Sequence, residues 1–344
     1  MSVDRAAVAR ARARRALRRH ARVALLAVLV LVLFAVSLMV GRTFYGPVDV
    51  VRVVLGETVP GASFTVGELR LPRTVLGLLV GAALGLSGVT FQTMLRNALA
   101  SPDIIGISSG ASAAAVVGLV LLDWSASVTS VVAIVSALVT TVLIYGLSWS
   151  RGGAADSRMI LIGIGFAAML HSVISYVILQ AAAWDVQLVM RWLTGSLNSA
   201  DWARVAPLAV AFVLIAPLLI AQAGRLALMQ HGQDSATALG VPVERTRLLA
   251  VVAAVALLAF ATAAAGPVAF VAFLAGPIAA RVVGGGGSMM VPAMLVGALL
   301  VLGGDLVGQY ALANRYPVGV VTGAFGAPYL IYLLVRTNRA GGSL

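Results

Sequence analysis

The amino-acid sequence predicts an all-α integral membrane protein with ten transmembrane helices. Of its 344 residues, 61% are hydrophobic and 10% are charged, whereas soluble domains carry about 25% charged residues. Long stretches without any charge recur along the chain, and one straight crossing of a membrane needs about 20 such residues. The arginines also concentrate in the connections that a ten-helix arrangement places on one side of the membrane.

Nine charge-free stretches mark the expected spans, and eight of them have the length of a single crossing. The exception, 248–280, would form one helix of about 50 Å, longer than the hydrocarbon core of roughly 30 Å. Gly266 and Pro267 lie in its middle, and proline both removes a backbone donor and clashes with the preceding turn. We therefore expect two crossings there and ten in all. The stretches are 23–41, 74–95, 104–122, 124–150, 159–184, 205–224, 248–280, 282–304 and 316–335.

The distribution of arginine predicts the orientation. Ten crossings place both termini on one side, which then carries 17 arginines against seven on the other. Because arginine is enriched in cytoplasmic connections, we expect both termini in the cytoplasm. The predicted organisation is a basic cytoplasmic arm (1–22), a ten-helix transmembrane domain (23–336) with a cytoplasmic loop at 225–247, and a cytoplasmic tail (337–344).

The arm holds eight arginines and is expected to lie beside anionic lipid headgroups. A secretory signal peptide also begins with a basic segment, but the apolar run that follows here is too long and lacks a convincing cleavage site. The net charge of +12 would indicate nucleic acid only if it gathered on one soluble face. Because the charge is spread over both sides of the membrane, no nucleic-acid partner is expected.

Several kinds of chemistry are not expected from the composition. The chain has no cysteine, which excludes disulfides and thiolate metal sites, and its three histidines are scattered. It has no lysine and hence no lysine-containing phosphate-binding loop, so any ATP hydrolysis must occur on another chain. We expect no catalytic residue, cofactor or metal site. Asp305 and then His171 are the main ionisable residues within the spans, where such residues either serve ion pathways or form structural hydrogen bonds.

The most informative stretch is 70–112. Gly77, Gly81 and Gly85 recur every fourth residue, which places a groove of small residues on one helix face where another backbone can approach closely. Polar segments bound this helix on both sides. The sequence begins R-L-P-R and, after the helix, continues R-N-A-L-A-S-P-D and G-I-S-S-G-A-S.

This order of motifs resembles the permease family of iron–siderophore, haem and vitamin B12 ABC importers. The matching segments are 69–73, 91–92, 96–102 and 106–111, with Ala98 where the family usually has proline. The resemblance covers most of the chain. It implies a type II, B12-importer-like permease with ten helices and a short extra helix after the break at 266–267. The segment 191–198, and the lack of the histidine that many relatives carry within 270–281, resemble the ferric-enterobactin-like branch.

The loop 225–247 is the predicted contact with an ATPase. Asp234 or Ser235 can cap a short helix in which Ala236 and Leu239 share a face, and Gly240 can end it. Such a helix suits insertion into a groove of a partner, although a plain surface helix would have the same pattern. The family resemblance implies that this is the coupling helix. The residues that match its pattern are Gly232, Ala236, Leu239 and Gly240.

The resemblance also implies two further sites. Arg70 and Arg73 are expected as exposed cations that dock an extracytoplasmic binding protein, with Arg315 as a substitute for a family arginine that is Gln309 here. Two cytoplasmic turns are expected to form the inner gate, although asparagine, aspartate and serine are favoured in any turn. The gate residues are Asn97, Leu99, Asp156 and Ser157.

The predicted function is therefore the permease subunit of an ATP-driven importer for a ferric siderophore, located in the cytoplasmic (inner) membrane. Its expected partners are two ATPase subunits, a second permease copy or paralogue, the binding protein and membrane lipid. Three alternatives remain open: haem or cobalamin as the substrate, a secondary carrier driven by an ion gradient, and a membrane scaffold that transports nothing. A secondary carrier would depend on Asp305.

Overall fold

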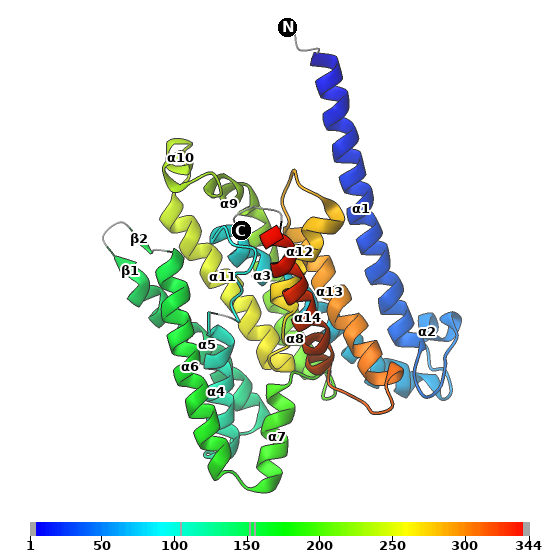
Figure 1. Cartoon of the computed structure of the whole chain (residues 1–344). Coiled ribbons are helices and arrows are strands. Elements are labelled where there is room, and N and C mark those ends of the chain that lie inside the picture. Colours follow the sequence, from blue (N-terminus) through cyan, green and yellow to red (C-terminus); the bar gives the residue numbers. More distant parts are fainter. Residues whose placement is uncertain (1–4, 104, 151–152, 155, 340–344) are drawn as a thin grey trace.

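The computed structural model describes residues 5–339 except 104, 151–152 and 155. Within this part of the chain, seven helices are long and apolar enough to cross a membrane, and three shorter apolar helices accompany them (Figure 1). This confirms the predicted all-α fold class with ten membrane helices. They are α1 (Arg5–Met39), α3 (Leu71–Met94), α4 (Ile107–Val120), α5 (Ala126–Ser148), α6 (Asp156–Gln180), α8 (Trp202–Ala221), α11 (Val243–Ala265), α12 (Val271–Val283), α13 (Met290–Leu306) and α14 (Val318–Arg339).

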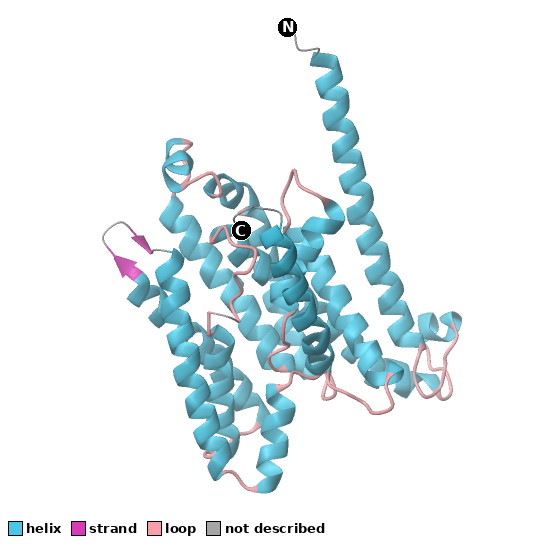
Figure 2. Ribbon diagram, viewed as in Figure 1, coloured by secondary structure: helices cyan, strands magenta, loops and turns pink. Residues whose placement is uncertain are grey.

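Short elements occupy the connections. A small antiparallel hairpin between α5 and α6, β1 (Trp149–Ser150) with β2 (Gly153–Ala154), was not predicted (Figure 2). The remaining elements are α2 (Pro47–Val54), the π-helical η1 (Ser63–Arg70), α7 (Ala183–Leu193), α9 (Ala223–Met229), α10 (Gln233–Ala238) and the π-helical η2 (Val307–Ala311).

Helix α3 lies at the centre of the bundle and packs against α8, α11, α12 and α13. Its glycines permit this packing. A Cβ added at Gly81 would overlap the carbonyl oxygen of Gly297 in α13, and one added at Gly88 would overlap that of Ala272 in α12. The predicted close approach of backbones along this helix is therefore confirmed, and it extends one turn beyond the expected glycines.

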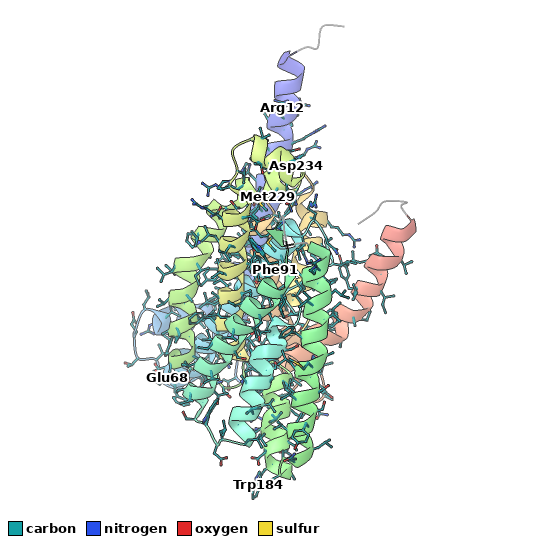
Figure 3. All side chains as sticks on the ribbon, turned by 90° about the vertical axis from the view of Figure 1, so that its left-hand side faces the viewer. Arg12, Glu68, Phe91, Trp184, Met229 and Asp234 are labelled. Carbon is teal, nitrogen blue, oxygen red and sulfur yellow. The ribbon has the colours of Figure 1, made fainter. Side chains whose placement is uncertain are left out.

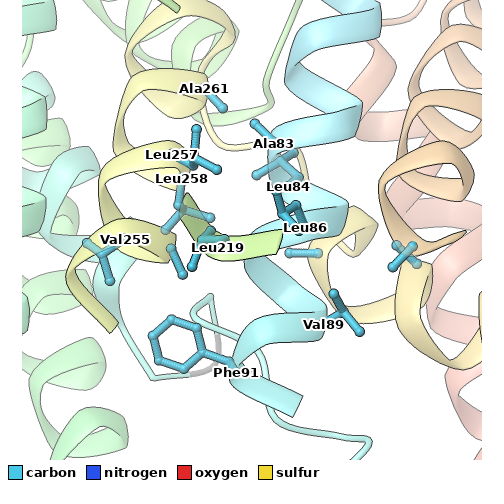
Figure 4. Close-up of a cluster of buried hydrophobic side chains, with 14 of the residues drawn as sticks. Ala83, Leu84, Leu86, Val89, Phe91, Leu219, Val255, Leu257, Leu258 and Ala261 are labelled. Carbon is cyan, nitrogen blue, oxygen red and sulfur yellow. The ribbon is translucent and has the colours of Figure 1, made fainter. Parts of the chain in front are cut away.

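The core around α3 is apolar. Large side chains of α3, α8 and α11 meet there and are almost fully buried (Figure 4). They include Leu84, Leu86, Phe91, Leu219, Leu257 and Leu258. The outer faces of α5, α6 and α8, by contrast, expose valine, leucine and isoleucine side chains, which suits contact with lipid.

Both described ends of the chain lie at the same end of the bundle, as an even number of crossings requires (Figure 1). The same end carries α9, α10, the β-hairpin and the turn between α12 and α13, and we call it the terminal end. The opposite end carries α2, α7 and the loop that precedes α14. Whether the terminal end faces the cytoplasm stays a prediction.

Three local predictions need comment. The chain does break after Ala265, where Gly266 adopts φ +74°, and this confirms the split of 248–280. The short extra helix expected after the break is wrong, because residues 266–270 are non-helical and lead directly into α12. The described part of the basic arm is also no separate tail, since its residues from Arg5 onward continue the first span as a single helix.

Candidate functional site

The predicted coupling loop forms a two-helix projection from the terminal end, made of α9 and α10. Gly232 (φ +107°) and Gly240 (φ +80°) bound α10 in backbone conformations that other residues rarely adopt. No side chain caps α10, so the expected cap by Asp234 or Ser235 is wrong. The backbone amide of Val241 donates to the carbonyl of Ala236 (3.0 Å) and turns the chain back toward α11.

Ala236 and Leu239 point in opposite directions. The methyl group of Ala236 is fully buried in the core of the protein, whereas Leu239 is 66% exposed. The prediction that they share a face is wrong, because α10 has only six residues and ends before Leu239. Ala236, together with the buried Leu226 and Met229 of α9, anchors the projection. Leu239 is left as its exposed apolar contact.

At the opposite end, Arg70 does not have the exposure expected of a docking residue, since it is 8% exposed. Its guanidinium donates to the carbonyl oxygens of Leu38 (2.9 Å), Met39 (2.9 Å) and Thr43 (2.6 Å). It also lies over the ring of Tyr45 at 5.1 Å. The last carbonyl groups of a helix have no intrahelical partner and attract cations, so Arg70 binds the end of α1 to the start of α3.

Arg73 is partly exposed and forms a bidentate ion pair with Asp305 of α13. Its Nε donates to Oδ2 at 2.8 Å and its Nη2 to Oδ1 at 2.6 Å. The third nitrogen, Nη1, donates to the amide oxygen of Asn198 (2.9 Å), which also accepts from Gln309 (3.1 Å). We call Arg73, Asn198, Asp305 and Gln309 the outer polar cluster. Arg315 lies exposed in the loop before α14 and, among the described residues, is bonded to no member of this cluster.

The predicted gate residues are only partly described. Asn97 and Leu99 belong to one tight turn after α3, in which the Asn97 side-chain oxygen accepts from the Leu99 amide (2.8 Å). Asp156 and Ser157 open α6, but their side chains lie outside the described residues. The turn chemistry expected at Asn97 is therefore present, and its role as a gate stays a prediction.

The structure also contains a largely apolar cavity of about 390 Å³ with a group of polar side chains on its wall, of which only His171 was recognised from the sequence. Residues of α4, α6, α14 and the break at 267–270 line it. Ser108 donates to the carboxylate of Asp103, and Ser109 Oγ lies 3.4 Å from His171 Nε2. Asp103 escaped notice because it immediately precedes the charge-free stretch 104–122. The signal was the density of serine around it, at Ser101, Ser108, Ser109 and Ser112.

Comparison with known proteins supports the resemblance. The model of the FecCD transport family matches residues 29–336. The ferric enterobactin transport system permease protein FepG of Escherichia coli is 40% identical over 85% of this chain and 88% of its own length. The achromobactin transport system permease protein CbrC of Dickeya dadantii is 37% identical over 92% of each chain.

A solved structure agrees with the fold. An inward-facing metal-chelate type ABC transporter superposes with a TM-score of 0.82 at 26% identity, over 91% of this chain and 98% of that one. The family match spans all ten membrane helices, from within α1 to within α14. The chain thus belongs to the FecCD transport family, whose members are transport permeases rather than enzymes.

Proposed function

We propose that this chain is the permease subunit of an ABC importer that moves a ferric siderophore across the cytoplasmic membrane. The carrying observation is the ten-helix fold of a metal-chelate type transporter combined with an anchored, outward-facing projection at its terminal end. The names of the two relatives, one for ferric enterobactin and one for achromobactin, support a siderophore as the substrate. Haem and cobalamin are the alternative substrates.

In this proposal the terminal end faces the cytoplasm and α10 is the coupling helix. ATP is hydrolysed on two separate ATPase subunits, and each would hold one projection. Leu239 supplies the apolar contact, while the buried Ala236 transmits the movement of the partner to α9 and α11. Because α3 packs backbone against backbone with its neighbours, the helices would tilt as rigid bodies.

A second permease copy or paralogue would complete the pathway, which is expected to be broad and weakly polar. The described helices carry few charged side chains along their length, and this suits a bulky chelate. Asn97 and Leu99, with Asp156 and Ser157 at the start of α6, are the proposed inner gate. They occupy two connections at the terminal end, which would be the cytoplasmic mouth.

For the binding protein we propose Arg73 and Arg315 as docking residues and withdraw Arg70. Arg73 is partly exposed, and its ion pair with Asp305 could exchange for a carboxylate of the binding protein. Arg315 is exposed on the neighbouring loop. The guanidinium of Arg70 instead donates its hydrogen bonds to backbone carbonyls of Leu38, Met39 and Thr43. Arg70 therefore stabilises the surface on which docking would occur.

The test is uptake in proteoliposomes that contain the permease, its co-expressed ATPase subunit and an outside binding protein. We expect ferric siderophore to accumulate inside the vesicles only when ATP is also inside them, on the side that corresponds to the cytoplasm. The same assay with haem or cobalamin decides the substrate. Uptake without ATP would contradict the proposal and favour a secondary carrier. That alternative has less support, because Asp305 is engaged in a bidentate ion pair with Arg73.

A further inference from the structure

Helix α1 extends far beyond the membrane at the terminal end. Its 35 residues correspond to about 52 Å at 1.5 Å per residue, against a hydrocarbon core of roughly 30 Å. The apolar part begins at Val23, and every residue from 11 to 18 is exposed. Figure 1 shows this part of α1 standing clear of the bundle, in line with the membrane-spanning part of the helix.

Four arginines of this extension share one face. Arg12, Arg15, Arg19 and Arg22 follow one another at intervals of three, four and three residues, which places them on one side of a helix. We call them the arginine stripe. Arg14 and Arg18, also exposed, lie about a third of a turn around the helix.

The lower half of the stripe is anchored to the bundle. Arg22 Nη1 donates to the carbonyl of Val283 at 3.2 Å, and Arg19 Nη2 donates to that of Ser288. Val283 is the last residue of α12, and Ser288 lies in the turn that leads from α12 to α13, at the terminal end. The anchored arginines therefore fix the rotation of α1, so that the upper half of the stripe, Arg12 and Arg15, faces the space above the bundle.

Arg12 and Arg15 have no counter-charge among the described residues, in which Arg52 pairs with Glu57 and Arg73 with Asp305. Like charges at this spacing destabilise an isolated helix, so a partner that supplies negative charge would stabilise the extension. Arg15 lies about 10 Å and Arg12 about 15 Å above Arg22 along the helix axis. At physiological salt, electrostatic attraction is screened over about 8 Å. Anionic headgroups at the level of Arg22 would therefore attract Arg12 and Arg15 only weakly.

The level of Arg12 points to the partner. Figure 3 shows Arg12 farther out from the bundle than Asp234 of α10 and Met229 of α9. Any protein seated on the α9–α10 projection must occupy the space outside α10, and thus the level of Arg12. We infer that Arg12 and Arg15, the upper half of the arginine stripe, bind an acidic surface of the ATPase subunit as a second contact in addition to α10, which lies across the terminal end from α1 (Figure 1). This inference rests on the proposed function.

The lack of cysteine in the chain makes a site-specific test direct. Arg12→Cys and, as a matched control on the neighbouring face, Arg14→Cys each provide a single thiol for a photoactivatable cross-linker. With the permease in nanodiscs and the co-expressed ATPase subunit bound, we expect a cross-link to that subunit from position 12 at least fivefold stronger than from position 14. Equal yields from both positions, or cross-links to lipid alone, would overturn the inference.

A binding measurement adds the energetic evidence. In nanodiscs of neutral lipid, the double variant Arg12→Glu/Arg15→Glu should raise the Kd for the ATPase subunit at least tenfold, and Arg14→Glu/Arg18→Glu less than threefold. A loss that occurs only in anionic lipid would assign the stripe to lipid headgroups and refute the inference. Size-exclusion profiles check that both variants stay folded.

The outcome also separates this inference from the proposed function. If the unmodified permease binds no ATPase subunit, the proposed function itself fails. If it does bind, and Leu239→Asp releases the subunit while Arg12→Glu/Arg15→Glu does not, only the inference about the stripe fails.

Discussion

Two pairs of arginines at opposite ends of the bundle differ in what surrounds them. At the end that carries α2 and α7, Arg70 and Arg73 are bound by carbonyl oxygens and by a carboxylate of the same chain. At the terminal end, Arg12 and Arg15 are exposed on a helix that stands clear of the bundle. Both sets have the same side chain and the same charge. The difference shows that the available acceptors, rather than the charge, decide whether an arginine stabilises the fold or stays exposed and available for a partner.

The largest effect is expected at Arg70. Replacing it with alanine leaves the carbonyls of Leu38, Met39 and Thr43 without their charged donor, and each buried acceptor left unpaired costs about 1–3 kcal/mol. We expect a large loss of thermal stability in detergent. Arg70→Lys should recover only part of it, because an ammonium group lacks the fork of the guanidinium. An unchanged melting temperature of Arg70→Ala would contradict the role of Arg70 in holding α1 to α3.

The next largest effect is expected at Leu239. Leu239→Asp places a charge on the exposed apolar contact and should weaken the affinity for the ATPase subunit at least tenfold, or about 1.4 kcal/mol. ATP-dependent uptake should fall by a similar factor. Stability should stay nearly unchanged, since the side chain is 66% exposed. Ala236→Leu is the contrasting variant, because added volume at a fully buried site costs about 1–3 kcal/mol of stability. Equal losses of stability in the two variants would contradict the assignment of anchor and contact.

A smaller effect is expected within the outer polar cluster. Arg73→Ala leaves Asp305 without its ion pair, and Asp305→Ala does the same to Arg73. The double variant should lose less free energy of unfolding than the two single variants lose together. For this partly exposed pair we expect a coupling energy of roughly 1 kcal/mol. Thermal unfolding of the four proteins gives this cycle. A coupling near zero would mean that Arg73 is as free as Arg315.

Arg315 should have the smallest effect on the fold. Arg315→Glu is a change at an exposed loop position and should alter stability by less than about 0.5 kcal/mol. We still expect weaker binding of the binding protein, with a difference that shrinks as salt rises, because exposed charges are screened. Binding curves at two salt concentrations measure it. An affinity that does not change at low salt would remove Arg315 from the docking residues.

Much of the fold could be predicted from charge and periodicity. The charge-free runs identified the membrane helices, and Gly266 with Pro267 identified the break between α11 and α12, because a membrane and a proline each impose a local constraint on the sequence. The extent of α1 was missed, since its arginines resemble a flexible tail in composition. A run of arginine and alanine also forms helix well, so the helix continues from the membrane span into the basic arm.

The sites were less predictable because tertiary contacts decide them. The burial of Arg70 depends on carbonyl groups that lie some 30 residues earlier, at Leu38 and Met39, and these reach it only once α1 packs beside α3. The helical spacing of Ala236 and Leu239 held no information, because α10 ends between them. Asp305 was recognised as important, but its partner Arg73 lies 232 residues away.

The bond network of Arg70 has a mechanical consequence. Because it joins the far end of α1 to the central helix, and Arg19 and Arg22 join the near end to the α12–α13 turn, α1 behaves as a stiff lever with its fulcrum on the bundle. A tilt of a few degrees in the helices would sweep the free tip of α1 through several ångströms, well outside the bilayer. The position of that tip would then differ between the states in which one or the other mouth of the protein is open.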